Sequence, residues 1–113
     1  MEINAITKNP QQLVDAIVKA LENDDLQTWT IVEESNENFY FTYLTKDKQC
    51  YKIIIIKTRV IITDEDNSKV KFIFTYLPHK PEPTKVDYGI IIGRFTEALI
   101  VHFHDRFKYL IIN

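Results

Sequence analysis

Residues 69–77 read KVKFIFTYL, a stretch in which every second residue is bulky and apolar. Val70, Phe72 and Phe74 share one parity, whereas Lys71 and Ile73 occupy the other. Successive side chains of a β-strand point to opposite faces of the sheet, so this alternation predicts a strand with one buried face.

The same alternation predicts three earlier strands, over residues 27–34, 38–46 and 49–63. The apolar residues that share the core parity there are Trp29, Ile31, Phe39, Phe41, Tyr43, Ile54, Ile56, Val60 and Ile62. The opposite parity mixes isoleucines with Lys57, Arg59 and Lys71. It therefore predicts a second face that is too apolar to stand wholly in water and too charged to form a second core.

Short polar segments over residues 35–37, 47–48 and 64–68 connect these strands, and their composition is typical of turns. Such connections predict an antiparallel meander. A two-residue turn at 47–48 sets Phe41 opposite Ile54, and a loop over 64–68 sets Val60 opposite Phe72.

An N-terminal helix is predicted to start at Asn9, with Pro10 at its first position and Gln12 completing a capping box. Leu13, Ile17 and Leu21 form its apolar stripe. Residues 22–25 are acidic and should end the helix.

The C-terminal part is predicted to be a long helix over residues 87–109, reached through the proline-containing crossover 78–87. Tyr88, Phe95 and Leu99 recur at helical spacing on one face of it. The alternative is a hairpin that turns at Asp105-Arg106. It stays open because the short apolar runs within residues 98–112 are compatible with either a helix or a strand.

The expected fold is therefore α+β in one domain over residues 1–113. An N-terminal helix precedes a four-stranded antiparallel meander, and a long C-terminal helix packs on the aromatic face. We expect the second face to be covered by the N-terminal helix or by another subunit.

Composition and net charge indicate a globular protein without a general affinity for polyanions. Hydrophobic residues make up 45% of the 113, and the formal net charge of −2 supplies no general attraction to polyanions. The single cysteine, Cys50, indicates a reducing compartment. The N-terminus shows no basic start or apolar run typical of a signal peptide, so we expect a cytoplasmic protein with no membrane segment.

Residues with catalytic or metal-binding potential form no established motif. Gly89 and Gly93 are the only glycines, which excludes phosphate loops and dinucleotide fingerprints. His102 and His104 would diverge on a helix, one packed at the core edge and one solvated. The turn that begins at Asp64 lacks the glycine and glutamate of a calcium loop, and no motif pairs Cys50 with a histidine. We expect no enzyme activity, metal or cofactor.

Two surface patterns remain as candidate binding sites. In a meander, the first and third connections lie at the same end of the sheet, and here they form an acidic rim that could steer a basic partner. Its residues are Glu33, Glu34, Glu37, Asp64, Glu65 and Asp66.

The second pattern is the mixed face, where tyrosines lie among cations, as single-stranded nucleic-acid platforms require. Its residues are Tyr40, Tyr51, Lys57, Arg59 and Lys71. These patterns predict a non-catalytic protein that binds another protein and forms a homodimer, in an accessory, chaperone-like or inhibitory role. The alternative is single-stranded nucleic-acid binding through the mixed face.

Overall fold

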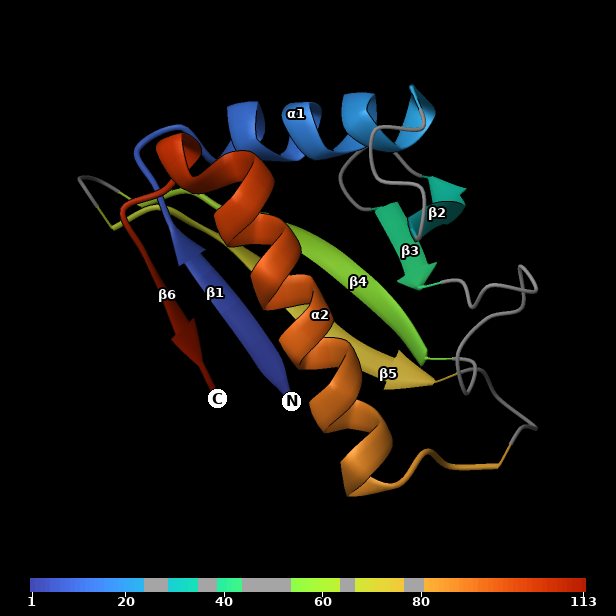
Figure 1. Cartoon of the computed structure of the whole chain (residues 1–113). Coiled ribbons are helices and arrows are strands. Elements are labelled where there is room, and N and C mark those ends of the chain that lie inside the picture. The colour runs from blue at the N-terminus through green and yellow to red at the C-terminus, as the bar shows by residue number, and fades with distance from the viewer. Residues whose placement is uncertain (24–28, 35–38, 44–53, 64–66, 77–80) are drawn as a thin grey trace.

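The computed structural model describes residues 1–23, 29–34, 39–43, 54–63, 67–76 and 81–113, with the backbone alone for 30–34 and 39–43. Figure 1 shows a sheet with two helices against it. The elements are β1 (Glu2–Ile6), α1 (Pro10–Glu22), β2 (Trp29–Glu34), β3 (Phe39–Tyr43), β4 (Ile54–Ile61), β5 (Lys69–Tyr76), α2 (Lys85–Phe103), the 3₁₀ turn η2 (His104–Arg106) and β6 (Tyr109–Ile112).

The sheet is antiparallel, with the strand order β2-β3-β4-β5-β1-β6. The predicted α+β class is confirmed, and β2 to β5 follow one another as a meander. The sheet as a whole is not a pure meander, because β1 and β6 from the two ends of the chain extend it beyond β5. The apolar pattern of the sequence predicted neither of these strands.

The predicted registers kept the correct faces but were displaced. Phe41 lies opposite Ile56 instead of Ile54. Val60 lies opposite Val70 instead of Phe72. A displacement by two residues preserves parity, so the hydrophobic pattern could not detect it. Ile62 follows the end of β4 and is 77% exposed, so its assignment to the core was wrong.

The long C-terminal helix is confirmed over Lys85–Phe103, where the hairpin alternative is wrong. Thr84 and Asp87 form a capping box at its start. The prediction that helix continues to residue 109 was wrong, because η2 turns the chain and residues 109–112 become β6.

Both helices pack against the same face of the sheet (Figure 1). Leu13 and Ile17 of α1 are buried in one cluster with Phe72 of β5 and with Ile91 and Leu99 of α2. The aromatic face is thus confirmed as the core face beneath α2. Of the two covers expected for the opposite face, α1 was wrong, since an apolar stripe does not specify which side of a sheet it meets. Cover by another subunit stays a prediction.

Phe95 lies at the aromatic centre of this core. Its ring makes edge contacts with Trp29, Phe72 and Phe74, at centroid distances of 5.4, 4.8 and 5.9 Å. Such contacts add to the stabilisation from apolar burial, so α2 is tightly coupled to the sheet.

The start of α1 agrees with the prediction in position but not in capping. Asn9 is the N-cap residue and Pro10 follows it, yet no side chain supplies the cap hydrogen bond. Instead, the Thr7 hydroxyl accepts from the Asn9 backbone N–H (3.2 Å) and donates to the Arg106 carbonyl (2.8 Å). Thr7 thereby ties the β1–α1 turn to the segment that leads into β6.

Candidate binding surface

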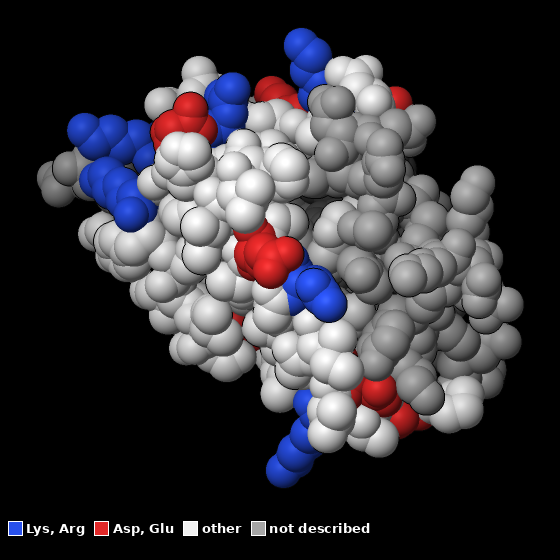
Figure 2. Space-filling model, viewed as in Figure 1, with Lys and Arg blue, Asp and Glu red and all other residues white. Residues whose placement is uncertain are grey.

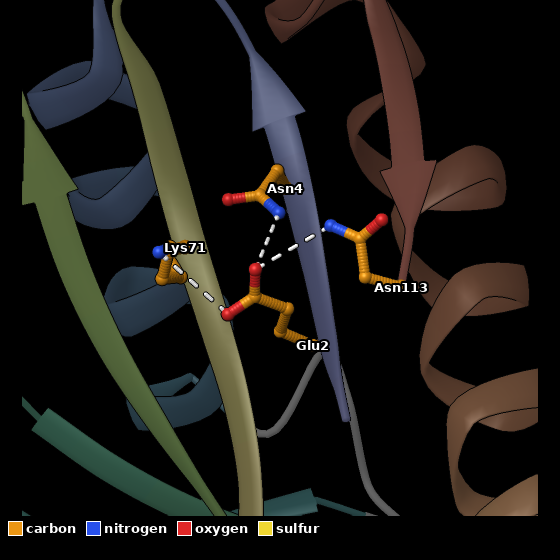
Figure 3. Close-up of polar contacts among 4 residues, drawn as sticks. All are labelled: Glu2, Asn4, Lys71 and Asn113. Atoms are coloured by element: carbon orange, nitrogen blue, oxygen red, sulfur yellow. Dashed lines mark hydrogen bonds and ion pairs between the residues drawn. The ribbon is translucent and has the colours of Figure 1, made fainter.

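The face of the sheet that points away from both helices is called the open face here. None of the described helices or strands lies over it. Figure 3 views this face, with the helices behind the sheet. Strand pairing aligns its residues in rows across the sheet, so residues distant in sequence become neighbours.

One row of the open face runs from Tyr40 through Lys57, Ile73 and Glu2, and each residue lies opposite the next. The adjacent row contains Arg59, Lys71, Asn4 and Ile111 in the same way. The predicted mixed face is therefore assembled in part, because Lys57, Arg59 and Lys71 share the open face. Tyr40 is placed there by its backbone register, and Tyr51 lies outside the described residues.

Four cations on β4 and β5 form a basic cluster on the open face: Lys57, Arg59, Lys69 and Lys71. Lys57 and Arg59 are exposed, and Lys69 and Lys71 are half-buried. Arg59 lies directly opposite Lys71, and like charges in that position destabilise a sheet. The free protein thus carries an unfavourable arrangement that an anionic partner would relieve.

The Glu2 carboxylate offsets part of this charge (Figure 3). Its Oε2 lies 3.6 Å from Lys71 Nζ, and its Oε1 accepts from Asn4 Nδ2 at 3.3 Å and Asn113 Nδ2 at 3.4 Å. The hydrogen bond from Asn4, together with Asn113 and the charge of Lys71, lowers the pKa of Glu2. Glu2 therefore stays ionised and counters one cation of the cluster.

Asn4, the donor to Glu2, has only 3% of its surface exposed. Its Oδ1 atom is buried and has no hydrogen-bond partner among the described residues. Leaving a buried acceptor unpaired costs stability. The polar row across β1 and β5 is thus less favourable than the apolar packing on the helix side.

Apolar and aromatic residues flank the basic cluster. Tyr109 and Ile111 of β6 lie on the open face with 51% and 41% of their surface exposed, and Ile73 of β5 is half-buried. The face therefore combines cations with ring and aliphatic surface. Tyr109 was not predicted on this face because the expected helix extended to residue 109. Lys69 was not predicted because it lies at the first position of its strand, next to the turn.

The acidic rim is only partly within the described residues. Glu33 and Glu34 are at the end of β2, where the backbone alone is described. Glu37, Asp64, Glu65 and Asp66 lie outside the described residues. The rim stays a prediction.

The two histidines among the described residues lie in different elements. His102 is in the last turn of α2 and His104 in η2, and both are exposed, so the expectation that one packs at the core edge was wrong. Among the described residues, no group of three or more His, Cys, Asp or Glu side chains could hold a metal ion. Cys50 is not among those residues.

Figure 2 shows the opposite, helix-bearing side, where Lys and Arg side chains gather near the end of α2 and charged side chains of both signs lie over the middle of that helix. A groove of about 510 Å³ lies there between α1 and α2, with Lys19, His102 and Arg106 along it. Lys19 and His102 occupy the last turns of their helices. A cation such as Lys19 at this position stabilises the end of its helix, which accounts for its charge without a ligand.

Comparison of this chain with protein-family models, curated proteins and solved structures finds no match. Neither of the helices in the described part of the chain is long and apolar enough to cross a membrane. The open face must therefore be interpreted from its own chemistry.

Proposed function

We propose that this chain is a non-catalytic binding protein and that the open face is its binding surface. The partner would be another protein, which presents an acidic segment to the basic cluster. The supporting observation is Arg59 opposite Lys71 on a face that neither helix covers. Glu2 offsets part of the repulsion between these cations through Lys71, and negative charge from a partner would reduce it further.

The half-buried Ile73 and the exposed Ile111 favour a protein partner. These residues would give an acidic peptide apolar surface beside the charges. Interfaces commonly combine an apolar centre with charges that steer the encounter. The formal charge of −2 gives no long-range attraction to a polyanion, so recognition would depend on the local cluster.

Single-stranded nucleic acid is the second candidate, and Tyr109 is the observation that favours it. Its exposed ring shares the open face with the basic cluster, and Tyr40 is placed on that face by register. Bases stack on such rings while cations contact phosphates. Cover of this face by α1 would disfavour this function, but α1 packs on the other face. The net charge of −2 and the isoleucines of the face still favour a protein partner.

Fluorescence anisotropy at about 50 mM salt distinguishes the two candidates. The probes are a labelled glutamate-rich peptide and a labelled oligothymidylate. We expect the peptide to bind, and we expect Lys57→Glu together with Arg59→Glu to weaken binding at least about tenfold. The control is Lys85→Glu with Arg94→Glu, which makes the same charge change on the helix side.

Peptide binding that survives the open-face variant but is lost in the control would overturn the assignment of the surface. Binding of the oligothymidylate alone, reduced by Tyr109→Ala, would replace the proposed function by the second candidate. If neither probe binds, the open face does not recognise anionic macromolecules and the proposal fails.

A further inference from the structure

The two edges of the sheet differ in how they resist pairing with another strand. At the β2 edge, the register shifts between Ile31 and Glu33 as a bulge, and Glu33 and Glu34 add charge. Bulges and charges are common protection against edge-to-edge pairing. The β6 edge reads YLII, has no charge or proline, and pairs with β1 in unbroken register. Apart from its shortness, β6 carries no such protection.

Backbone hydrogen bonds show which groups of β6 point outward. The Glu2 N–H donates to the Asn113 carbonyl (3.1 Å), and the Asn113 N–H donates to the Glu2 carbonyl (2.9 Å). In an antiparallel pair, inward and outward groups alternate along each strand. Ile111, like Asn113, is therefore bonded to β1. The N–H and C=O groups of Leu110 and Ile112 lie on the outer edge.

The side chains of β6 leave apolar surface on both sides of this edge. Leu110 and Ile112 lie opposite the core residues Ala5 and Ile3, so they are on the helix side. Leu110 packs against the core, but Ile112 is 54% exposed. On the open face, Ile111 is 41% exposed. The apolar core thus extends to the β6 edge of the sheet, where apolar side chains remain exposed to solvent.

We propose that a second copy of this chain pairs with this edge through its own β6, antiparallel and centred on Ile111. Leu110 of each copy then lies opposite Ile112 of the other, and the outward groups of both residues find partners. The Lys108 N–H is already bonded to the Ile6 carbonyl, which favours this register over one centred on Leu110. Such a two-fold interface is self-complementary, as closed dimers require.

A second copy fits this edge better than a foreign strand. β6 carries no charge that would select a partner of opposite sign. Its outward N–H and C=O groups, on Leu110 and Ile112, have the same spacing in a second copy, so two β6 strands can bond to each other. The pairing also places Ile111 against its symmetry mate and covers Ile112 with Leu110 of the other copy. The two open faces lie on the same side of the joined sheet, so the dimer would present two basic clusters together.

Light scattering of the chain alone tests the dimer. We expect a mass of about twice 13.4 kDa at micromolar concentrations. Ile111→Lys places two like charges on the two-fold axis and should give the monomer mass. The matched control, Ile62→Lys, changes an exposed isoleucine beyond the end of β4 and should leave the dimer intact.

Oxidative crosslinking tests the register. In a Cys50→Ser background, Ile111→Cys should form a covalent dimer, because residue 111 meets its own copy. Tyr109→Cys, which would lie opposite Asn113 of the other copy, should not.

A monomeric parent overturns the proposal, as does a dimer that survives Ile111→Lys or one that crosslinks through residue 109 instead of 111. Loss of the dimer in the open-face variant Lys57→Glu with Arg59→Glu would move the interface to that face. These outcomes do not depend on the anionic probes, so the dimer and the proposed function can fail separately.

Discussion

The rings of Phe72 and Phe95 pack edge to face, with centroids 4.8 Å apart and planes inclined at 68°. Phe72 is fully buried in β5, and Phe95 comes from the middle of α2. The pair therefore couples β5 of the sheet to α2.

Truncation of either ring should destabilise the fold strongly. Phe72→Ala and Phe95→Ala are each expected to lower the free energy of unfolding by about 3–5 kcal/mol, because a cavity replaces a buried ring. The double variant should lose less than the sum, since the rings contact each other. Urea titration measures these values. Ile62→Ala, at an exposed site, is the control and should cost less than about 0.5 kcal/mol.

Acid should weaken the contribution of Glu2 to stability. Because the folded state lowers the pKa of Glu2, its contribution is present above the ordinary glutamate pKa and is lost as pH falls through the lowered value. Glu2→Gln should therefore destabilise at neutral pH and approach the parent once the pH falls below the lowered pKa of Glu2. Urea titrations across this range test the convergence. A gap that widens in acid would contradict the assigned direction.

The contribution of the capping box at Thr84 to stability should be measurable separately from that of the core. Thr84→Ala removes the acceptor for the Asp87 N–H (3.2 Å) and should cost about 0.5–2 kcal/mol. Thr84→Ser keeps the hydroxyl and should recover most of this loss. Thermal unfolding followed by circular dichroism compares the three proteins. Equal stability of the alanine and serine variants would mean that the cap contributes nothing.

Thr7 should matter more than its position in a turn suggests. Thr7→Val keeps the shape but removes the donor to Arg106 and the acceptor for Asn9, so we expect a loss of about 1–3 kcal/mol. Hydrogen exchange should show faster opening at residues 109–112 in this variant. Thr7→Ser provides the matched control and should behave like the parent. Unchanged exchange in β6 would show that Thr7 does not hold this segment.

Periodicity predicted the central strands and the presence of both helices, because their apolar residues recur over several turns or strand repeats. It missed β1, where Ile3 and Ala5 alternate with polar residues over too short a span. It missed β6 because Leu110, Ile111 and Ile112 are continuous apolar residues that fit a helix or a strand.

The candidate surface was predictable only in part. The parity of Lys57, Arg59 and Lys71 assigned them to one face, and strand pairing confirms it. Their neighbours Glu2 and Asn4 could not be found without β1. Whether the face was covered depended on the side chosen by α1, and the amphipathic pattern of Leu13 and Ile17 does not contain that information.

The pairing of Glu2 with Asn113 joins residues that are 111 positions apart. During synthesis, β2 to β5 can assemble from adjacent segments, whereas β1 emerges first and must wait for residues 109–112 to complete its outer side. A nascent chain halted before Tyr109 would expose an unpaired edge on β1. Chaperone capture or aggregation of ribosome-bound intermediates should therefore peak late, just before β6 is translated.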